Sequence, residues 1–145
     1  MKRTMKITAL VMAALMAVMM LAGCGAKTLE EKLNSDSDTK SEIEKIEKQY
    51  EAQSGIDDVD ISAKENTLIM KLKVAVTTTD TTVDVYKNAF VSSFKNSESS
   101  LKSAISDLED DTKIDGVKMQ VIVVDQKDVE LFNKTYDKNG EVTSK

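Results

Sequence analysis

The sequence contains no histidine, no proline and no tryptophan, and its only cysteine is Cys24. Without histidine or a second thiol, the chain cannot form a zinc cluster, a Ser–His–Asp triad or an internal disulfide. Its five glycines are scattered and form neither a dinucleotide-binding fingerprint nor a P-loop. These absences favour a protein that is not an enzyme and that holds no cofactor or metal.

Arginine occurs once, at Arg3, and with Lys2 and Lys6 it gives the chain a positively charged start. An apolar run follows from Ala9 to Ala22. This run has the length of a signal-peptide core and is shorter than the ~20 residues of a membrane-spanning helix. The start of the chain therefore predicts export.

The apolar run ends in Leu21, Ala22, Gly23 and Cys24, which resemble the lipobox of bacterial lipoproteins. The resemblance implies that residues 1–23 are a cleaved signal peptide and that the Cys24 thiol carries diacylglycerol, with or without a further N-acyl chain such as palmitate. Two acyl chains anchor a protein stably, whereas one binds reversibly. We expect a lipid-anchored protein on the extracytoplasmic side of the cell membrane. A secreted protein with a free cysteine and an uncleaved short anchor are the alternatives.

The mature chain is acidic. Residues 1–23 hold three of the 20 basic side chains and none of the 25 acidic ones, so residues 24–145 have a formal net charge of −8. They also lack arginine, the side chain that grips phosphate groups bidentately. We therefore expect no nucleic-acid partner.

Two capping patterns predict helices early in the mature chain. Thr28 with Glu31 fits a capping box and predicts a short helical turn within residues 24–38, the lipidated tether. Thr39 with Glu42 repeats the spacing and predicts the start of a second helix. Its apolar face carries Ile43, Ile46 and Tyr50.

Alternating polar and apolar residues predict two β-hairpins. The first runs from Val59 to Val74 around residues 64–66, and the second from Val117 to Tyr136 around residues 125–128. Leu131 and Phe132 are adjacent and both apolar, so the sequence does not determine which of them points into the core from the last strand.

Between the hairpins, a helical period predicts a long helix from about Asp80 to Asp111. Its apolar stripe contains Phe90, Phe94, Leu101, Ala104 and Leu108. We interpret this stripe as core and not as a partner groove or coiled-coil seam, because the hairpins need a cover. Acidic residues at its end, from Asp107 to Asp111, are expected to be solvated.

These elements predict one α+β domain over residues 39–137, followed by a polar tail at 138–145. The order is α-β-β-α-β-β. We expect a four-stranded antiparallel sheet from the two hairpins, with two main helices packed on one face.

The lipobox, the segment TLEEKLNSD at residues 28–36 and this order of elements resemble a family of small lipoproteins from Gram-positive bacteria. That family is classed as a domain of unknown function. The closing segment VDQKDVELFNKTYD is similar to the family's last hairpin, although its turn lacks the usual glycine. The resemblance implies location and fold and supplies no catalytic residue.

The outer face of the sheet is the candidate interaction surface. It carries an apolar remnant among lysines, at Ile69, Lys71, Lys73, Ile122 and Val124. Scattered surface hydrophobics are the competing interpretation.

Three functions fit these features. The leading hypothesis is a non-enzymatic binding module of the cell envelope, which contacts an envelope protein or a cell-wall polymer. A small-ligand receptor or transport accessory protein is the alternative, for which 122 residues are few. A hydrolase built on Asp57, Asp58 and Asp60 is the third, and calcium at the acidic turns is a weaker idea still.

Overall fold

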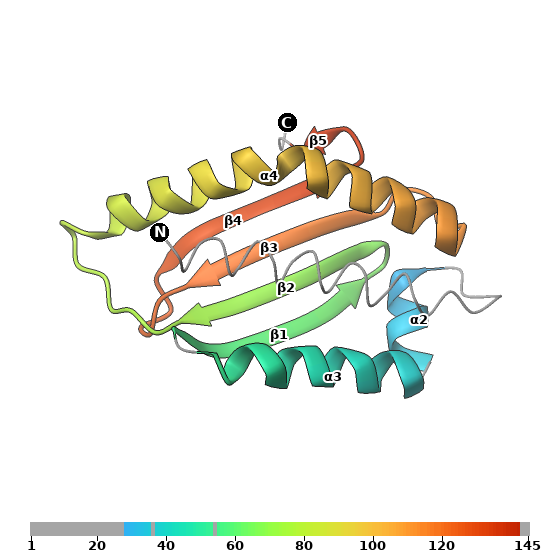
Figure 1. Ribbon diagram of the computed structural model, residues 1–145, viewed down its shortest axis with the longest axis horizontal. Coiled ribbons are helices and arrows are strands. Elements are labelled where there is room, and N and C mark those ends of the chain that lie inside the picture. The colour runs from blue at the N-terminus through green and yellow to red at the C-terminus, as the bar shows by residue number, and fades with distance from the viewer. Residues whose placement is uncertain (1–27, 36, 54, 143–145) are drawn as a thin grey trace.

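The computed structural model describes residues 28–142 except 36 and 54, so the predicted signal peptide and Cys24 lie outside the described residues (Figure 1). Within these residues, three helices and five strands follow one another. In order they are α2 (Leu29–Ser35), α3 (Ser37–Glu51), β1 (Ile56–Lys64), β2 (Thr67–Val74), α4 (Val83–Thr112), β3 (Lys118–Val124), β4 (Glu130–Asp137) and β5 (Gly140–Glu141).

The α+β class is confirmed, and the sheet differs from expectation in two details. Its order is β1-β2-β3-β4-β5, and its central pair, β2 and β3, is parallel. The 30-residue helix α4 returns the chain to the end of the sheet where β2 began, so β3 repeats the direction of β2. The fifth strand comes from the segment interpreted as a polar tail, where Gly140 pairs with Asp137.

One hydrophobic core lies between the helices and the inner face of the sheet. Figure 1 shows α3 running along β1 and α4 running along β4. The stripe of α4 is buried as predicted, and Phe94 stacks on Phe132 of β4 with ring centroids 4.5 Å apart. Apolar residues of α3 and α4 join the inward residues of β1 to β4 in a single cluster, so both helices cover the same face.

The first capping prediction is confirmed and the second is wrong. The backbone N–H of Glu31 donates to the Thr28 hydroxyl over 3.1 Å, which caps α2. Helix α3 instead begins at Ser37, and Thr39 lies buried within it. The capping-box spacing alone could not distinguish a helix start from the first turn inside a helix.

The closing hairpin resolves the ambiguous phase of the last strand. A register shift at Val123 and Val124 leaves an extra residue in β4, and both Leu131 and Phe132 are buried. In the turn, Asp128 adopts a φ of 63°, a conformation that favours glycine. The turn thus places aspartate in a left-handed conformation without the help of a glycine.

Candidate functional site

The outer face of the sheet carries no helix among the described residues, because the apolar faces of α3 and α4 both join the inner-face cluster. Since side chains alternate along a strand, Ile69, Lys71 and Lys73 of β2 point to this outer face. Their inward neighbours Leu68, Met70 and Leu72 are fully buried, as the alternation requires. We call this surface the open face.

The structure brings all five predicted surface residues onto neighbouring strands. In the parallel β2–β3 pair, Lys71 lies beside Ile122 and Lys73 beside Val124, while Ile69, two residues before Lys71, lies beside Gln120. Val124 is only 5% exposed, so it supports the surface more than it contributes to it. Ile69 and Ile122 are partly exposed and form the apolar centre of the open face.

Opposite charges flank this apolar centre. Across the β1–β2 pair, Asp58 lies beside Lys73 and Asp60 beside Lys71. The ammonium of Lys73 also pairs with the Asp128 carboxylate at 2.8 Å, and this hydrogen bond raises the pKa of Lys73. The open face therefore carries aspartates on β1, two lysines on β2 and one partly exposed isoleucine on each of β2 and β3.

The three carboxylates considered for hydrolysis do not meet in an enclosed pocket. Asp57, Asp58 and Asp60 are all exposed on β1. The side chain of Gln126 donates to Asp57 over 2.9 Å, which links β1 to the β3–β4 turn. A general acid needs a dry setting to hold its proton, and this arrangement offers none.

A polar hollow of about 770 Å³ lies over the start of β3 and the second half of β4. Its floor contains Gln120, whose amide donates to Asn133 over 3.0 Å. The hollow is lined by Thr67, Lys118, Gln120, Asn133, Lys134, Thr135, Glu141 and Val142. Amides, hydroxyls and two lysines can offer hydrogen bonds here to a polar ligand or a polypeptide.

A smaller cavity of about 240 Å³ lies between α3 and β1. Glu47 lines it and accepts a hydrogen bond from the Ile61 N–H at 2.8 Å, while Glu51 accepts one from the Val59 N–H at 3.3 Å. Burial raises the pKa of Glu47. These carboxylates occupy the free edge of β1, where unpaired N–H groups would invite another strand.

Two buried carboxylates hold loops together, and the sequence did not reveal either. Asp125 accepts hydrogen bonds from the N–H and hydroxyl of Thr78 and from the N–H groups of Lys127 and Val129. These bonds, the one from the Thr78 N–H foremost, hold the pKa of Asp125 far below its usual range. Its oxygens are thus engaged by the protein itself, which weakens the calcium interpretation.

The second is Glu109, and the expectation that the acidic end of α4 is solvated is wrong for this residue. Only 8% of its side chain is exposed. It accepts hydrogen bonds from the N–H groups of Gly116 and Val117 and from the ammonium of Lys138 at 2.8 Å. The Lys138 hydrogen bond is the main cause that lowers the pKa of Glu109. The charge pattern of the sequence gave no signal for this role, because the partners come from the α4–β3 loop and the β4–β5 turn.

Within residues 28–142, leaving out 36 and 54, no helix is long and apolar enough to span a membrane. The same residues contain no group of three acidic side chains placed to hold a metal ion.

Comparison with known proteins places most of this chain in one group. The sequence profile of a family described as a domain of unknown function, DUF4854, matches residues 29–136. No curated protein and no solved structure matches the chain. The match begins at α2 and ends in β4, so it spans the helices and the four long strands.

Proposed function

The chain belongs to the DUF4854 family, a domain of unknown function, and on that premise we propose that it is a non-enzymatic binding module held outside the cell membrane by a lipid on Cys24. The open face of the sheet is the binding surface. An envelope protein is its partner, with a cell-wall polymer as the competing possibility.

The open face carries this proposal. A partly exposed apolar centre, Ile69 and Ile122, is bordered by Lys71 and Lys73 and by the aspartates that lie beside them on β1. An apolar centre with a polar rim is the usual build of a protein-binding patch. The aromatic rings of Phe90, Phe94 and Phe132 are buried in the core on the opposite side, so they give no platform for stacking sugars.

Site-specific photo-crosslinking tests the surface in intact cells. A photoreactive residue at Gln120, in the open face, is expected to capture one envelope protein, whereas the same residue at Lys95, exposed on α4, captures none. Ile122→Glu abolishes the adduct because it places a charge in the apolar centre.

Val91→Glu is the matched control, since Val91 is 42% exposed on α4 and away from the sheet. Adducts that form equally from both crosslinker positions, or that survive Ile122→Glu, contradict a docking role for the open face. An adduct with glycan instead of protein means that the partner is a cell-wall polymer and not an envelope protein.

Metabolic labelling tests the anchor separately. Cells grown with an isotope-labelled fatty acid are expected to yield labelled protein in the membrane fraction. Cys24→Ser removes the sulfur that forms the thioether, so the label is lost and the protein no longer fractionates with membranes. An unlabelled wild-type protein found free in the medium contradicts the anchor.

A small-ligand role is the second candidate, and the hollow around Gln120 and Lys118 supports it. Its volume of about 770 Å³ lies in the range of ligand sites, although its lining is more polar than most. A ligand that occupies it raises the melting temperature by mass action. A thermal-shift screen of amino acids, short peptides and sugars tests this role, and a flat screen argues against it.

A further inference from the structure

The start of the described chain is fixed to one end of the sheet. The N–H of Glu30 donates to the Glu65 carbonyl over 2.9 Å, and the Glu65 N–H donates back to the Glu30 carboxylate over 2.7 Å. The N–H of Leu29 donates to the Asn66 side chain. Because Leu29 is fully buried, this attachment is part of the folded core and not a loose contact.

Asn66 extends the attachment to a third segment. Its side-chain amide donates to the Asp115 carbonyl over 3.0 Å, and its own carbonyl accepts a hydrogen bond from the Lys118 N–H over 2.9 Å. The start of α2, the β1–β2 turn and the α4–β3 connection thus form one unit. We call this unit the anchor end and define it by Thr28, Glu65, Asn66 and Asp115.

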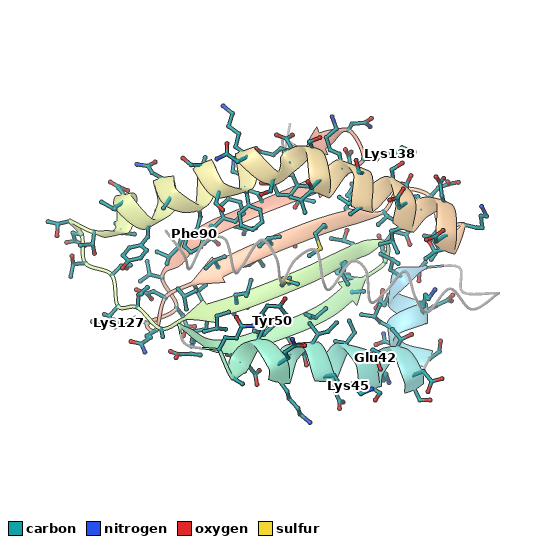
Figure 2. The ribbon with its side chains drawn as sticks, viewed as in Figure 1. Glu42, Lys45, Tyr50, Phe90, Lys127 and Lys138 are labelled. Carbon is teal, nitrogen blue, oxygen red and sulfur yellow. The ribbon has the colours of Figure 1, made fainter. Side chains whose placement is uncertain are left out.

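The opposite end of the sheet is a separate hydrogen-bonded unit. The β3–β4 turn holds the loop after β2 through Asp125 and Thr78, and the Gln126 N–H donates to the Val76 carbonyl. Figure 2 shows Lys127 at this end, with α2 at the other. We call it the far end.

Chain length ties the anchor end to the lipid. Four peptide units join Cys24 to Thr28, and fully extended they span at most ~14 Å. The eight residues of β2 carry the sheet roughly 25 Å further to the far end. The lipid therefore restrains one end of the domain closely and leaves the other out of reach.

From this geometry we infer that the anchor end contacts the bilayer surface, and that the strands point away from it so that the open face is presented sideways to partners. The inference rests on the proposed lipid at Cys24.

Fluorescence quenching in vesicles tests this orientation. With Cys24 acylated, the chain has no other thiol, so an introduced cysteine takes a dye uniquely. Asp115→Cys marks the anchor end and Lys127→Cys the far end, and both side chains are exposed. The lipidated proteins are incorporated into vesicles of phosphatidylglycerol and phosphatidylcholine that contain nitroxide-headgroup lipids.

We expect the dye at residue 115 to be quenched at least threefold more than the dye at residue 127. Equal quenching, or the reverse order, in protein that floats with the vesicles overturns the orientation and leaves the anchor intact. Failure of the unsubstituted protein to float overturns the anchor and the orientation together. The dye on Lys127→Cys without vesicles gives the unquenched reference.

Discussion

Removal of the Glu109 carboxylate is the sharpest test of the fold. Glu109 lies in the last turns of α4, and one of its oxygens accepts hydrogen bonds from the Gly116 and Val117 N–H groups at 2.9 and 3.0 Å. Val117 is fully buried, so no water replaces the acceptor that its N–H would lose. The other oxygen pairs with the Lys138 ammonium, which is half exposed.

The magnitude follows from these contacts. A hydrogen bond to a charged acceptor contributes about 1.5–3 kcal/mol, so the two N–H bonds together contribute about 3–6 kcal/mol. Alanine loses no side-chain entropy on folding, so the substitution regains up to about 2 kcal/mol of stability that ordering the Glu109 side chain costs. Losing the ion pair with the half-exposed Lys138 costs at most about 1 kcal/mol. We expect Glu109→Ala to lower the free energy of unfolding by about 3 kcal/mol.

Urea unfolding of a fragment that starts at Gly25 measures this loss, and a slope of about 1.5 kcal/mol/M converts it to a midpoint about 2 M lower. Glu109→Gln keeps an acceptor for both N–H groups and is expected to lose less than half as much. Lys138→Met and the exposed neighbour Asp110→Ala are controls that change the midpoint little. A Glu109→Ala midpoint within 0.3 M of wild type, roughly 0.5 kcal/mol at that slope, refutes the reasoning.

Acid provides an independent check on Glu109. Its pKa is lowered from an ordinary value of 4.5 in the folded state. The stabilisation from its charge is therefore complete above the unfolded pKa and is lost as pH falls through the folded pKa. The difference between wild type and Glu109→Gln should shrink on acidification below pH 4.5. A constant difference across that range contradicts the assignment.

Three further changes have defined outcomes. Burial raises the pKa of Glu47. Its charged form therefore lowers the stability of the fold as pH rises through that pKa. Glu47→Gln keeps an acceptor for the Ile61 N–H, so it should raise the melting temperature at pH 7 and change it little at pH 4. Asp128→Gly removes the positive-φ cost of about 1 kcal/mol and one exposed ion pair, so its unfolding free energy should stay within about 1 kcal/mol of wild type, whereas Asp128→Val should lose more. Phe94→Ala deletes a fully buried ring stacked on Phe132 and should cost about 3–5 kcal/mol in urea unfolding.

The open face was predictable because a strand alternates its side chains without help from other elements. The same rule placed Ile69, Lys71 and Lys73 on one side of β2, and the structure puts them there. The alternation rule could not predict which residues of β3 lie beside them. That Ile122 lies beside Lys71 depends on the parallel β2–β3 pairing, which links residues 51 positions apart.

Carboxylates show where prediction from sequence stopped. Asp107, Glu109, Asp110 and Asp111 are equivalent in the sequence, yet only Glu109 is buried. Glu109 is the buried one because the loop at Gly116 and the side chain of Lys138 pack against its turn of α4 and donate hydrogen bonds to it. Asp125 likewise differs from Asp128 through its contacts with Thr78.

The sequence by itself determined the types of element and their order, because the 3.6-residue and two-residue periods are local properties of the chain. It also determined the apolar stripe of α4. Only the tertiary structure decided that β2 and β3 run parallel, that β5 extends the sheet, and which carboxylates are buried. Those outcomes depend on how far α4 carries the chain and on which groups distant segments bring together, and neither is encoded within a local window.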